Sequence, residues 1–133
     1  MDFKLDKSHL LQQELFRSFA ENEIRPLAKE MDEKEAYDLD LLAKLHKYGL
    51  MGIPYSKEYG GCGSDTLAYT LCMEECSKVD ASTGITISVH TSLCCSGIEE
   101  FGTEEQKQKY LRPLVDGSKV GCFGLTEPGA GSD

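Results

Sequence analysis

The sequence predicts an all-α fold, an amino-terminal helical domain of about five to six helices in an up-and-down bundle. Two observations support this prediction. Apolar residues recur at helical spacing in separate segments of residues 1–117, and clusters of Gly, Pro, Ser and Asp lie between these segments. A third observation predicts that a second domain begins near the end of the chain. After Gly117 the residues become β-branched and aromatic without a helical stripe, so we assign residues 118–133 to the start of a truncated β domain.

The first helix is predicted over residues 7–31, with Asp6 as a plausible N-cap. Pro26 lies inside the helical pattern and removes one backbone donor, so we expect it to kink the helix or divide it. The predicted apolar stripe repeats every four residues and is widened by neighbouring positions. Its members are Leu11, Leu15 and Phe19, then Phe16, Ala20, Ile24, Leu27 and Ala28.

A second, short helix is predicted over residues 39–48, with Gly49 just past its end. The glycine-rich stretch "MGIPYSKEYGGCGSD", residues 51–65, is predicted to be a loop. Ser64 or Asp65 then caps a third helix that runs to about Lys78. The candidate buried positions of this helix are Leu67, Leu71, Met73 and Cys76.

The next helix is predicted from Asp80 or Ser82 through "ASTGITISVHTSLCCSGIEEFG". It carries almost no charge before Glu99, which is typical of a central helix buried by its neighbours. Thr103 and Gln106 have capping-box spacing and predict the start of a last helix. We expect Pro113 and Gly117 to end that helix.

The stretch "KVGCFGLT" after Gly117 is predicted to be a β-strand. An isolated strand is unstable without pairing partners. We therefore expect this chain to be the first domain of a longer protein that continues into a β-rich domain.

Composition narrows the function further. The 14 basic and 23 acidic residues give a net charge of −9, which disfavours nucleic acid and anionic membrane surfaces as partners. No apolar run reaches about 18 residues and no secretory signal is visible, so we expect a cytoplasmic protein. The six cysteines are then expected to be reduced core residues. Cys72 and Cys76 could face each other at i,i+4 spacing, but the Cys and His spacings predict no metal site.

Several motifs taken together resemble the amino-terminal part of the acyl-CoA dehydrogenase family. They are "YGGCGSD" at residues 59–65, "FGTEEQKQKYLRPLVDGSKVGCFGLTEP" from residue 101 and "GLTEPGAGSD" at the end. Within the family, "SVHTSL" at residues 88–93 is most similar to the short-chain, butyryl-CoA dehydrogenase type of bacteria. The resemblance implies a helical first domain, a β-barrel-like middle domain and a helical carboxyl-terminal domain.

The family reaction removes a proton from the α-carbon of an acyl-CoA and a hydride from the β-carbon, and FAD takes the hydride. By resemblance, the terminal loop lines FAD, and Ser132 also borders the acyl-CoA. Glycines permit close backbone approach, and exposed amides with hydroxyls can bond the cofactor. The residues implied are Phe123, Gly124, Leu125, Thr126, Glu127, Pro128, Gly129, Ala130, Gly131 and Ser132. The alternative is an ordinary Gly-Pro turn after a strand.

The resemblance places the catalytic glutamate in the carboxyl-terminal domain, so residues 1–133 alone are expected to be inactive. Glu127 lies in a turn between Thr126 and Pro128, where a carboxylate more often accepts backbone hydrogen bonds. His90 has two interpretations. It is a hydrogen-bonded core histidine, or it forms with Thr86, one turn earlier, a polar floor of the acyl pocket that favours short chains.

The implied partners are a short-chain acyl-CoA and an electron-transferring flavoprotein, and the whole protein is expected to be a homo-oligomer. By resemblance, the flavoprotein anchors a loop in an apolar pocket of the helical domain, with Phe19 on one wall and Leu67 and Leu71 on the other. All three residues also fit a plain core. Two alternatives stay open, an acyl-CoA oxidase-like flavoprotein and a freestanding, non-catalytic helical interaction module.

Overall fold

The computed structural model describes residues 4–132 and confirms the all-α prediction. Helical segments that join end to end form three of its long helices, and two shorter helices and a 3₁₀ turn stand alone. The segments are α1 (Lys7–Phe19), η1 (Ala20–Ile24) and α2 (Arg25–Lys34); α3 (Leu39–Lys47); η2 (Lys57–Tyr59); α4 (Thr66–Ser77); α5 (Ala81–Ser88), η3 (Val89–Cys95) and α6 (Ser96–Phe101); and α7 (Glu104–Gln106), η4 (Lys107–Leu111) and α8 (Arg112–Val115).

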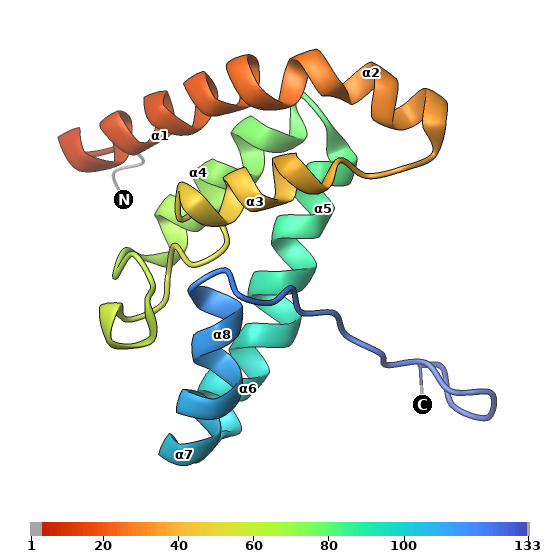
Figure 1. The fold of residues 1–133 in the computed structure, drawn as a ribbon. Helices are drawn as coiled ribbons and strands as arrows, with labels where there is room; N and C mark the ends of the chain where they lie inside the picture. Colours follow the sequence, from red (N-terminus) through yellow and green to blue (C-terminus); the bar gives the residue numbers. More distant parts are fainter. Residues whose placement is uncertain (1–3, 133) are drawn as a thin grey trace.

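Figure 1 shows how these helices are arranged. The α1–α2 rod spans one side of the molecule, with α4 against α1 and α3 on the inner side. The α5–α6 helix leads away from this layer, and η4 and α8 lie beside α6. The chain then leaves the bundle as an extended arm, residues 118–132. Within residues 4–132, no helix combines the length and the apolar character needed to cross a membrane.

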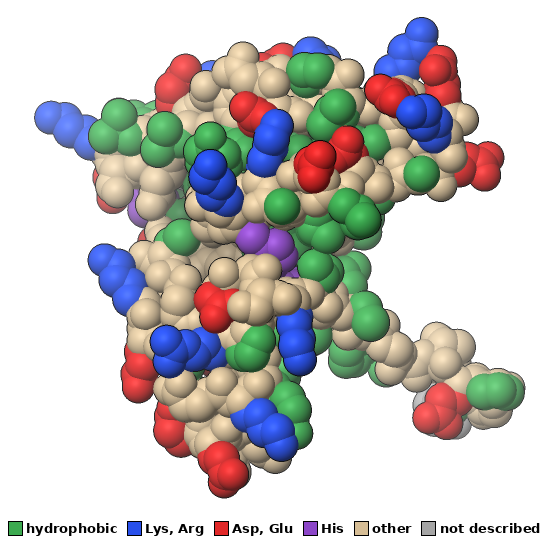
Figure 2. Space-filling model, viewed as in Figure 1, with side chains coloured by type: hydrophobic (Ala, Val, Ile, Leu, Met, Phe, Trp, Pro, Cys, Tyr) green, Lys and Arg blue, Asp and Glu red, His purple; other side chains and the backbone are tan. Residues whose placement is uncertain are grey.

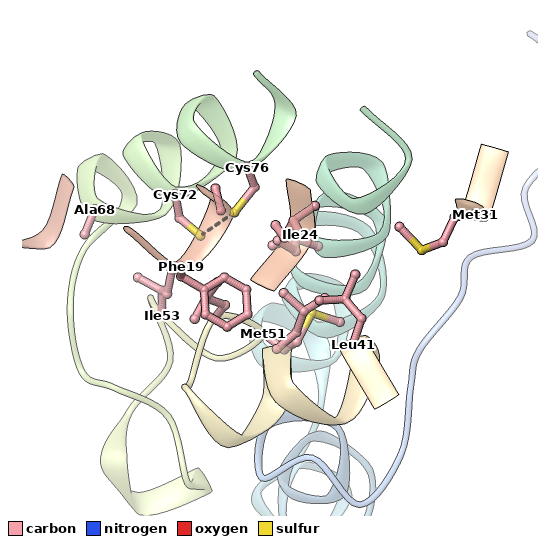
Figure 3. Close-up of a cluster of buried hydrophobic side chains, with 13 residues drawn as sticks. Phe19, Ile24, Met31, Leu41, Met51, Ile53, Ala68, Cys72 and Cys76 are labelled. Atoms are coloured by element: carbon pink, nitrogen blue, oxygen red, sulfur yellow. Dashed lines mark hydrogen bonds between the residues drawn. The ribbon is translucent and has the colours of Figure 1, made fainter. Parts of the chain in front are cut away.

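The main core lies where α1, η1, α3, α4 and α5 meet. Figure 3 shows the ring of Phe19 at its centre, between the sulfur atoms of Cys72 and Cys76 and the side chains from the neighbouring helices. The two sulfur atoms lie 3.9 Å apart, which confirms that these thiols face each other. A second cluster joins the α3–α4 loop to the last helix. It consists of Tyr55, Tyr59, Cys95, Leu111, Leu114 and Val115.

All six cysteines are free thiols, and three of them, Cys72, Cys76 and Cys95, are buried as expected. Cys62 and Cys122 differ from the expectation because both are exposed. Among residues 4–132, the His, Cys, Asp and Glu side chains form no group of three that could hold a metal ion.

The predicted helix caps are confirmed. The Asp6 carboxylate accepts the His9 amide (2.8 Å), and Thr103 and Gln106 form the capping box. For two helices the sequence left two candidate N-cap residues. The structure assigns the caps to Asp65 and Asp80, whose carboxylates accept backbone amides of the first turns of α4 and α5. Gly49 follows α3 with φ +77°, a conformation that costs glycine little.

The two helical prolines have different outcomes. Pro113 does not end its helix as predicted, and Gly117, with φ +91°, follows the end of the last helix. Pro26, predicted to kink or divide the first helix, lies directly after the π segment η1 that separates α1 from α2, and the helix continues through it. Directly before each proline the helix widens into π turns, in which the backbone amide of Arg25 donates to the Ala20 carbonyl and that of Arg112 to the Lys107 carbonyl. A wider turn moves the preceding carbonyls away from the proline ring, so the helix continues.

The predicted apolar stripe of the first helix is partly wrong. Phe19 is buried, but Leu11 and Leu15 are 68% and 67% exposed. Before Phe19, much of the face that α1 turns to α4 is polar instead. Four side chains of α1 form hydrogen bonds across this contact, His9 to Asp65, Gln12 to Ser64, and both Gln13 and Arg17 to Glu75.

Glu75 is a buried carboxylate that the sequence did not reveal. It is only 3% exposed and accepts hydrogen bonds from Arg17, Gln13 and Lys78, each at 3.1 Å. The Arg17 hydrogen bond, followed by Lys78, holds the pKa of the Glu75 carboxyl below its usual range. The buried charge of Glu75 is tolerated because hydrogen-bond donors surround it. This polar contact joins α1 to α4, a role that the sequence assigned to the side chains of Leu11 and Leu15.

Two further helix predictions need correction. Leu67 is 44% exposed and not a core residue. The helix through residues 81–101 is buried on one face only, because Ile85 and Leu93 are 62% and 46% exposed. Within residues 4–132, the structure holds nothing that covers this second face.

His9 links the caps of α1 and α4, and its ionisation is a first test of the structure. Its Nδ1 lies 2.9 Å from Asp6 and its Nε2 3.1 Å from Asp65. The Asp65 hydrogen bond is the main cause that raises the His9 pKa above its usual value. The contribution of protonated His9 to the stability of the fold is therefore fully present below about pH 6.5. It is lost as the pH rises through the raised pKa that His9 has in the folded state.

We expect Asp65→Asn to lower the His9 pKa towards its ordinary value in an NMR titration, because asparagine keeps an oxygen for the helix cap but loses the charge. Asp40→Asn, at an exposed carboxylate on α3, is the control and is expected to leave the His9 pKa unchanged. An unaltered His9 pKa in Asp65→Asn would contradict the bridging geometry.

Candidate functional site

The predicted strand after Gly117 is not a strand. Residues 119–126 are extended but pair with no other segment among residues 4–132. The arm ends in a tight turn, in which the Glu127 amide donates to the Ala130 carbonyl (2.9 Å) and the Ala130 amide to the Glu127 carbonyl (3.1 Å). Backbone groups of Glu127, rather than its carboxylate, thus close the turn. A strand needs a second extended segment with which it forms a ladder of backbone hydrogen bonds, and the described residues supply none.

The arm is unusually exposed for a segment with so many apolar groups. Phe123 and Leu125 are 49% and 70% exposed, and Figure 2 shows the arm standing clear of the bundle. A Cβ atom added at Gly124, Gly129 or Gly131 would meet no heavy atom within 4 Å. Packing within this chain therefore does not require glycine there, and the open space suits close approach by another molecule.

The chemistry of the arm fits a flavin cofactor. A flavin has a flat apolar ring with polar atoms along its edges, and FAD adds a pyrophosphate. The arm offers apolar side chains at Phe123 and Leu125, exposed hydroxyls at Thr126 and Ser132, and exposed backbone amides around the glycines. Amides and hydroxyls of this kind can donate to flavin edges and to phosphate oxygens.

The two residues predicted to form a pocket floor have different surroundings in the structure. Thr86 is half-buried, and its hydroxyl donates to the Ser82 carbonyl within its own helix (2.9 Å). His90 is fully buried, and its Nδ1 accepts the amide of Gly121 (3.0 Å). The core-histidine interpretation therefore describes His90 as it stands in this chain, and a role in the acyl pocket stays a prediction.

A groove beside the arm was not predicted. It has a volume of about 440 Å³ and lies between α6, η4 and the start of the arm. Among its lining residues, Leu93, Phe101, Tyr110 and Phe123 are each close to half exposed or more. The helical pattern predicted burial for the wall formed by residues 93–102, because it could not show which face of that helix lacks a neighbour.

A second pocket lies between α1, η1 and the end of α3, with a volume of about 300 Å³. Phe19 lines it as expected, but the opposite wall is different from the prediction. Tyr48 and Leu50 form that wall, and the Tyr48 ring meets the Phe19 ring edge-on at 5.3 Å. Leu67 and Leu71 lie on α4 and are not part of the pocket lining.

Residues 6–118 match the sequence family described as "Acyl-CoA dehydrogenase, N-terminal domain". The chain belongs to the acyl-CoA dehydrogenase family. It is 55% identical over 133 residues to the "Acyl-CoA dehydrogenase, short-chain specific" of Clostridium acetobutylicum, a match that covers 100% of this chain and 35% of the relative. A protein of the same description from Megasphaera elsdenii is 44% identical over 136 residues, with 100% and 36% covered.

Solved structures confirm the fold of this acyl-CoA dehydrogenase domain. Butyryl-CoA dehydrogenase from Megasphaera elsdenii superposes with a TM-score of 0.91 at 44% identity, over 98% of this chain and 35% of the other. A chain from a study of the electron transferring flavoprotein of Acidaminococcus fermentans superposes with a TM-score of 0.95 at 48% identity, over 99% and 35%. The chain thus spans about a third of the length of these relatives.

Proposed function

We propose that the whole protein is an FAD-dependent acyl-CoA dehydrogenase that oxidises a short-chain acyl-CoA to the 2,3-enoyl-CoA, and that this chain supplies one wall of the site. The observation that carries the proposal is the exposed arm, whose glycines face open space, in a chain 55% identical to a short-chain specific relative. When bound, FAD would accept the hydride from the β-carbon.

The arm residues would bind and orient the cofactor. The hydroxyls of Thr126 and Ser132 and the amides around Gly129 would donate to FAD, and Ser132 would also border the acyl-CoA. Phe123 and Leu125 would exclude water from the flavin ring. Glu127 is not proposed as the base, because the resemblance places that carboxylate in the carboxyl-terminal domain.

Thr126→Ala in the full-length protein tests the role of the arm. Loss of one hydrogen bond is expected to weaken FAD binding by about two- to twelvefold, measured by titrating apoprotein with FAD. We also expect the isolated chain to form no stoichiometric complex with FAD, since it supplies only one wall. A yellow complex of the isolated chain, or unchanged affinity in Thr126→Ala, would count against this site.

Two measurements distinguish the alternatives. An oxidase-like flavoprotein would pass electrons from reduced flavin rapidly to oxygen, whereas a dehydrogenase would need a protein acceptor. A freestanding interaction module would bind no flavin even when joined to the remaining domains. The predicted domain boundary at residues 117 and 118, the homo-oligomer and the cytoplasmic location stay predictions.

The acceptor that we propose is an electron-transferring flavoprotein, docked at the pocket of Leu15, Phe19 and Tyr48. The pocket is largely apolar and accessible, and Leu15 at its rim is 67% exposed. Figure 2 shows hydrophobic side chains gathered along α1 on this face. A pocket of this kind suits a single large aliphatic side chain from a partner, and such anchors dominate interface energies.

Leu15→Asp is expected to raise the KM for the acceptor flavoprotein about tenfold or more, because a charge would enter the apolar pocket. Reduction of the bound flavin by acyl-CoA is expected to stay unchanged. Leu67→Asp is the matched control, since Leu67 is also an exposed leucine but lies outside the pocket. A larger effect of Leu67→Asp would favour the α4 wall that the sequence predicted.

A further inference from the structure

The arm is tied to the bundle close to its base. The Lys119 amide donates to the Pro113 carbonyl (2.8 Å), and two residues later the Gly121 amide donates to Nδ1 of His90 (3.0 Å). The first residue assigned to FAD, Phe123, follows two residues after Gly121. In an extended chain this separation is about 7 Å, so the place where Gly121 is held decides where the cofactor-binding residues begin.

Gly121 passes the bundle at contact distance. A Cβ atom at this position would lie 2.4 Å from the sulfur and 3.0 Å from the Cβ of Cys94, and 3.3 Å from Cδ2 of Leu114. The chain is thus held between η3 and α8, where only glycine fits without displacing a neighbour. This contrasts with the open space around Gly124, Gly129 and Gly131 further along the arm.

His90 is a fixed acceptor for this amide. Its side chain is fully buried in η3, the His46 ring packs edge-on against it at 5.5 Å, and its Nε2 lies 3.5 Å from the Cys95 sulfur. Because Nδ1 accepts a hydrogen bond from Gly121, the ring proton belongs on Nε2. Burial and the contacts with His46 and Cys95 therefore fix the position of the acceptor.

The groups around the imidazole keep it neutral. Burial, and then the neighbouring His46, lower the pKa of His90 to about 4, against the opposing effect of a backbone hydrogen bond with Leu114. Burial also lowers the pKa of His46, against the opposing effect of Asp116, and raises the pKa of the Cys95 thiol to about 12. At neutral pH, therefore, the ring carries a single proton, and with that proton on Nε2 the Nδ1 atom can accept the hydrogen bond from Gly121.

We propose that His90 is a positioning residue for the cofactor site: by accepting the Gly121 amide, its buried imidazole sets where the arm leaves the bundle and so places residues 123–132 against FAD. The proposal rests on the proposed function of the arm. In this proposal the role of His90 depends on one atom, the acceptor Nδ1. A residue that forms a pocket floor would act through the size and polarity of its side chain, and a residue that only packs the core would act through its volume alone.

Three substitutions separate these roles in the full-length protein. His90→Asn places an oxygen near the position of Nδ1 and keeps the acceptor for Gly121, although it loses volume. His90→Gln extends its polar group towards the position of Nε2 and lacks the Nδ1 acceptor. His90→Leu fills much of the space and has no acceptor. Each variant is compared for FAD dissociation constant, flavin absorption spectrum and thermal unfolding.

We expect His90→Leu and His90→Gln to weaken FAD binding about tenfold and to shift the flavin spectrum, because the part-buried Gly121 amide loses its acceptor. His90→Asn is expected to stay within about twofold of the wild type in FAD affinity, even if its melting temperature falls. The proposal is overturned if His90→Asn loses as much affinity as His90→Leu, or if affinity follows melting temperature across the three variants.

Hydrogen exchange at the Gly121 amide separates this proposal from the proposed function. The amide is expected to be protected in the wild type and in His90→Asn, and to exchange quickly in His90→Leu. If the wild-type protein bound no FAD, the proposed function would fail, whereas the exchange pattern would still decide whether His90 holds the arm. Equal protection in His90→Leu and the wild type would show that Gly121 is held without the imidazole.

Discussion

Replacement of Leu41 by alanine is expected to lower the free energy of unfolding by about 2–5 kcal/mol, because the side chain is fully buried and its removal leaves a cavity. Leu41 lies on α3 in the main core, in contact range of the cluster around Phe19 and Met51 drawn in Figure 3. Domains of this size are stabilised by only about 5–15 kcal/mol. We therefore expect a large fall in the urea midpoint.

Leu39→Ala is the matched control for this substitution. Leu39 lies two residues away on the same helix but is 75% exposed, so its truncation removes little buried surface. Its effect on the free energy of unfolding is expected to stay within about 0.5 kcal/mol. Similar losses for the two leucines would mean that α3 does not pack as the structure describes.

Replacement of Gly61 by alanine is expected to cost about 1–3 kcal/mol or more, because the new methyl group has no room. A Cβ atom there would lie 2.2 Å from the Tyr55 carbonyl oxygen and 2.6 Å from its carbonyl carbon. These are backbone atoms, which cannot rotate away. Relief of the clash must move the loop, in which the Gly61 amide donates to Ser56 and the Gly63 amide to Tyr55.

Movement of this loop would also disturb the second core cluster. Tyr55 is 2% exposed, and its hydroxyl donates to the Thr91 carbonyl on η3. Gly97→Ala is the matched control, since a Cβ atom on that α6 glycine meets nothing within 4 Å. There we expect a gain of about 0.5–1 kcal/mol, because alanine favours the helix. Chemical unfolding that shows the same sign for both substitutions would contradict this prediction.

The sequence correctly predicted features that depend on interactions between residues close together in the chain. The caps at Asp6 and Thr103 and the turn at Gly49 depend on atoms a few residues apart, and all three were predicted. The family resemblance, which rests on short motifs in a fixed order, was confirmed by the family match over residues 6–118. The assignment of residues 123–132 to FAD stays a proposal, because the described chain supplies the donors but not the cofactor.

The incorrect predictions about burial and helix ends share one cause. A periodic pattern shows which residues lie on one face of a helix, but it does not show which segment packs against that face. Leu11 and Leu15 have helical core spacing, yet α4 turns Glu75 and Asp65 towards α1, and the leucines stay exposed. Pro113 carries a helix-ending signal, yet the π turn before it lets the helix continue. Both outcomes depend on contacts or turn geometry that no local pattern encodes.

By itself, the sequence determined the helices, their caps and the family, because these follow from backbone hydrogen bonding and from motifs close together in the chain. The tertiary structure alone decided which faces are buried, where the α1–α3 pocket has its second wall, and what holds the base of the arm. The contact between Gly121 and His90 joins residues 31 positions apart. Such a contact exists only once the packing of η3 against α8 has brought the two segments together, since burial depends on neighbours that folding supplies.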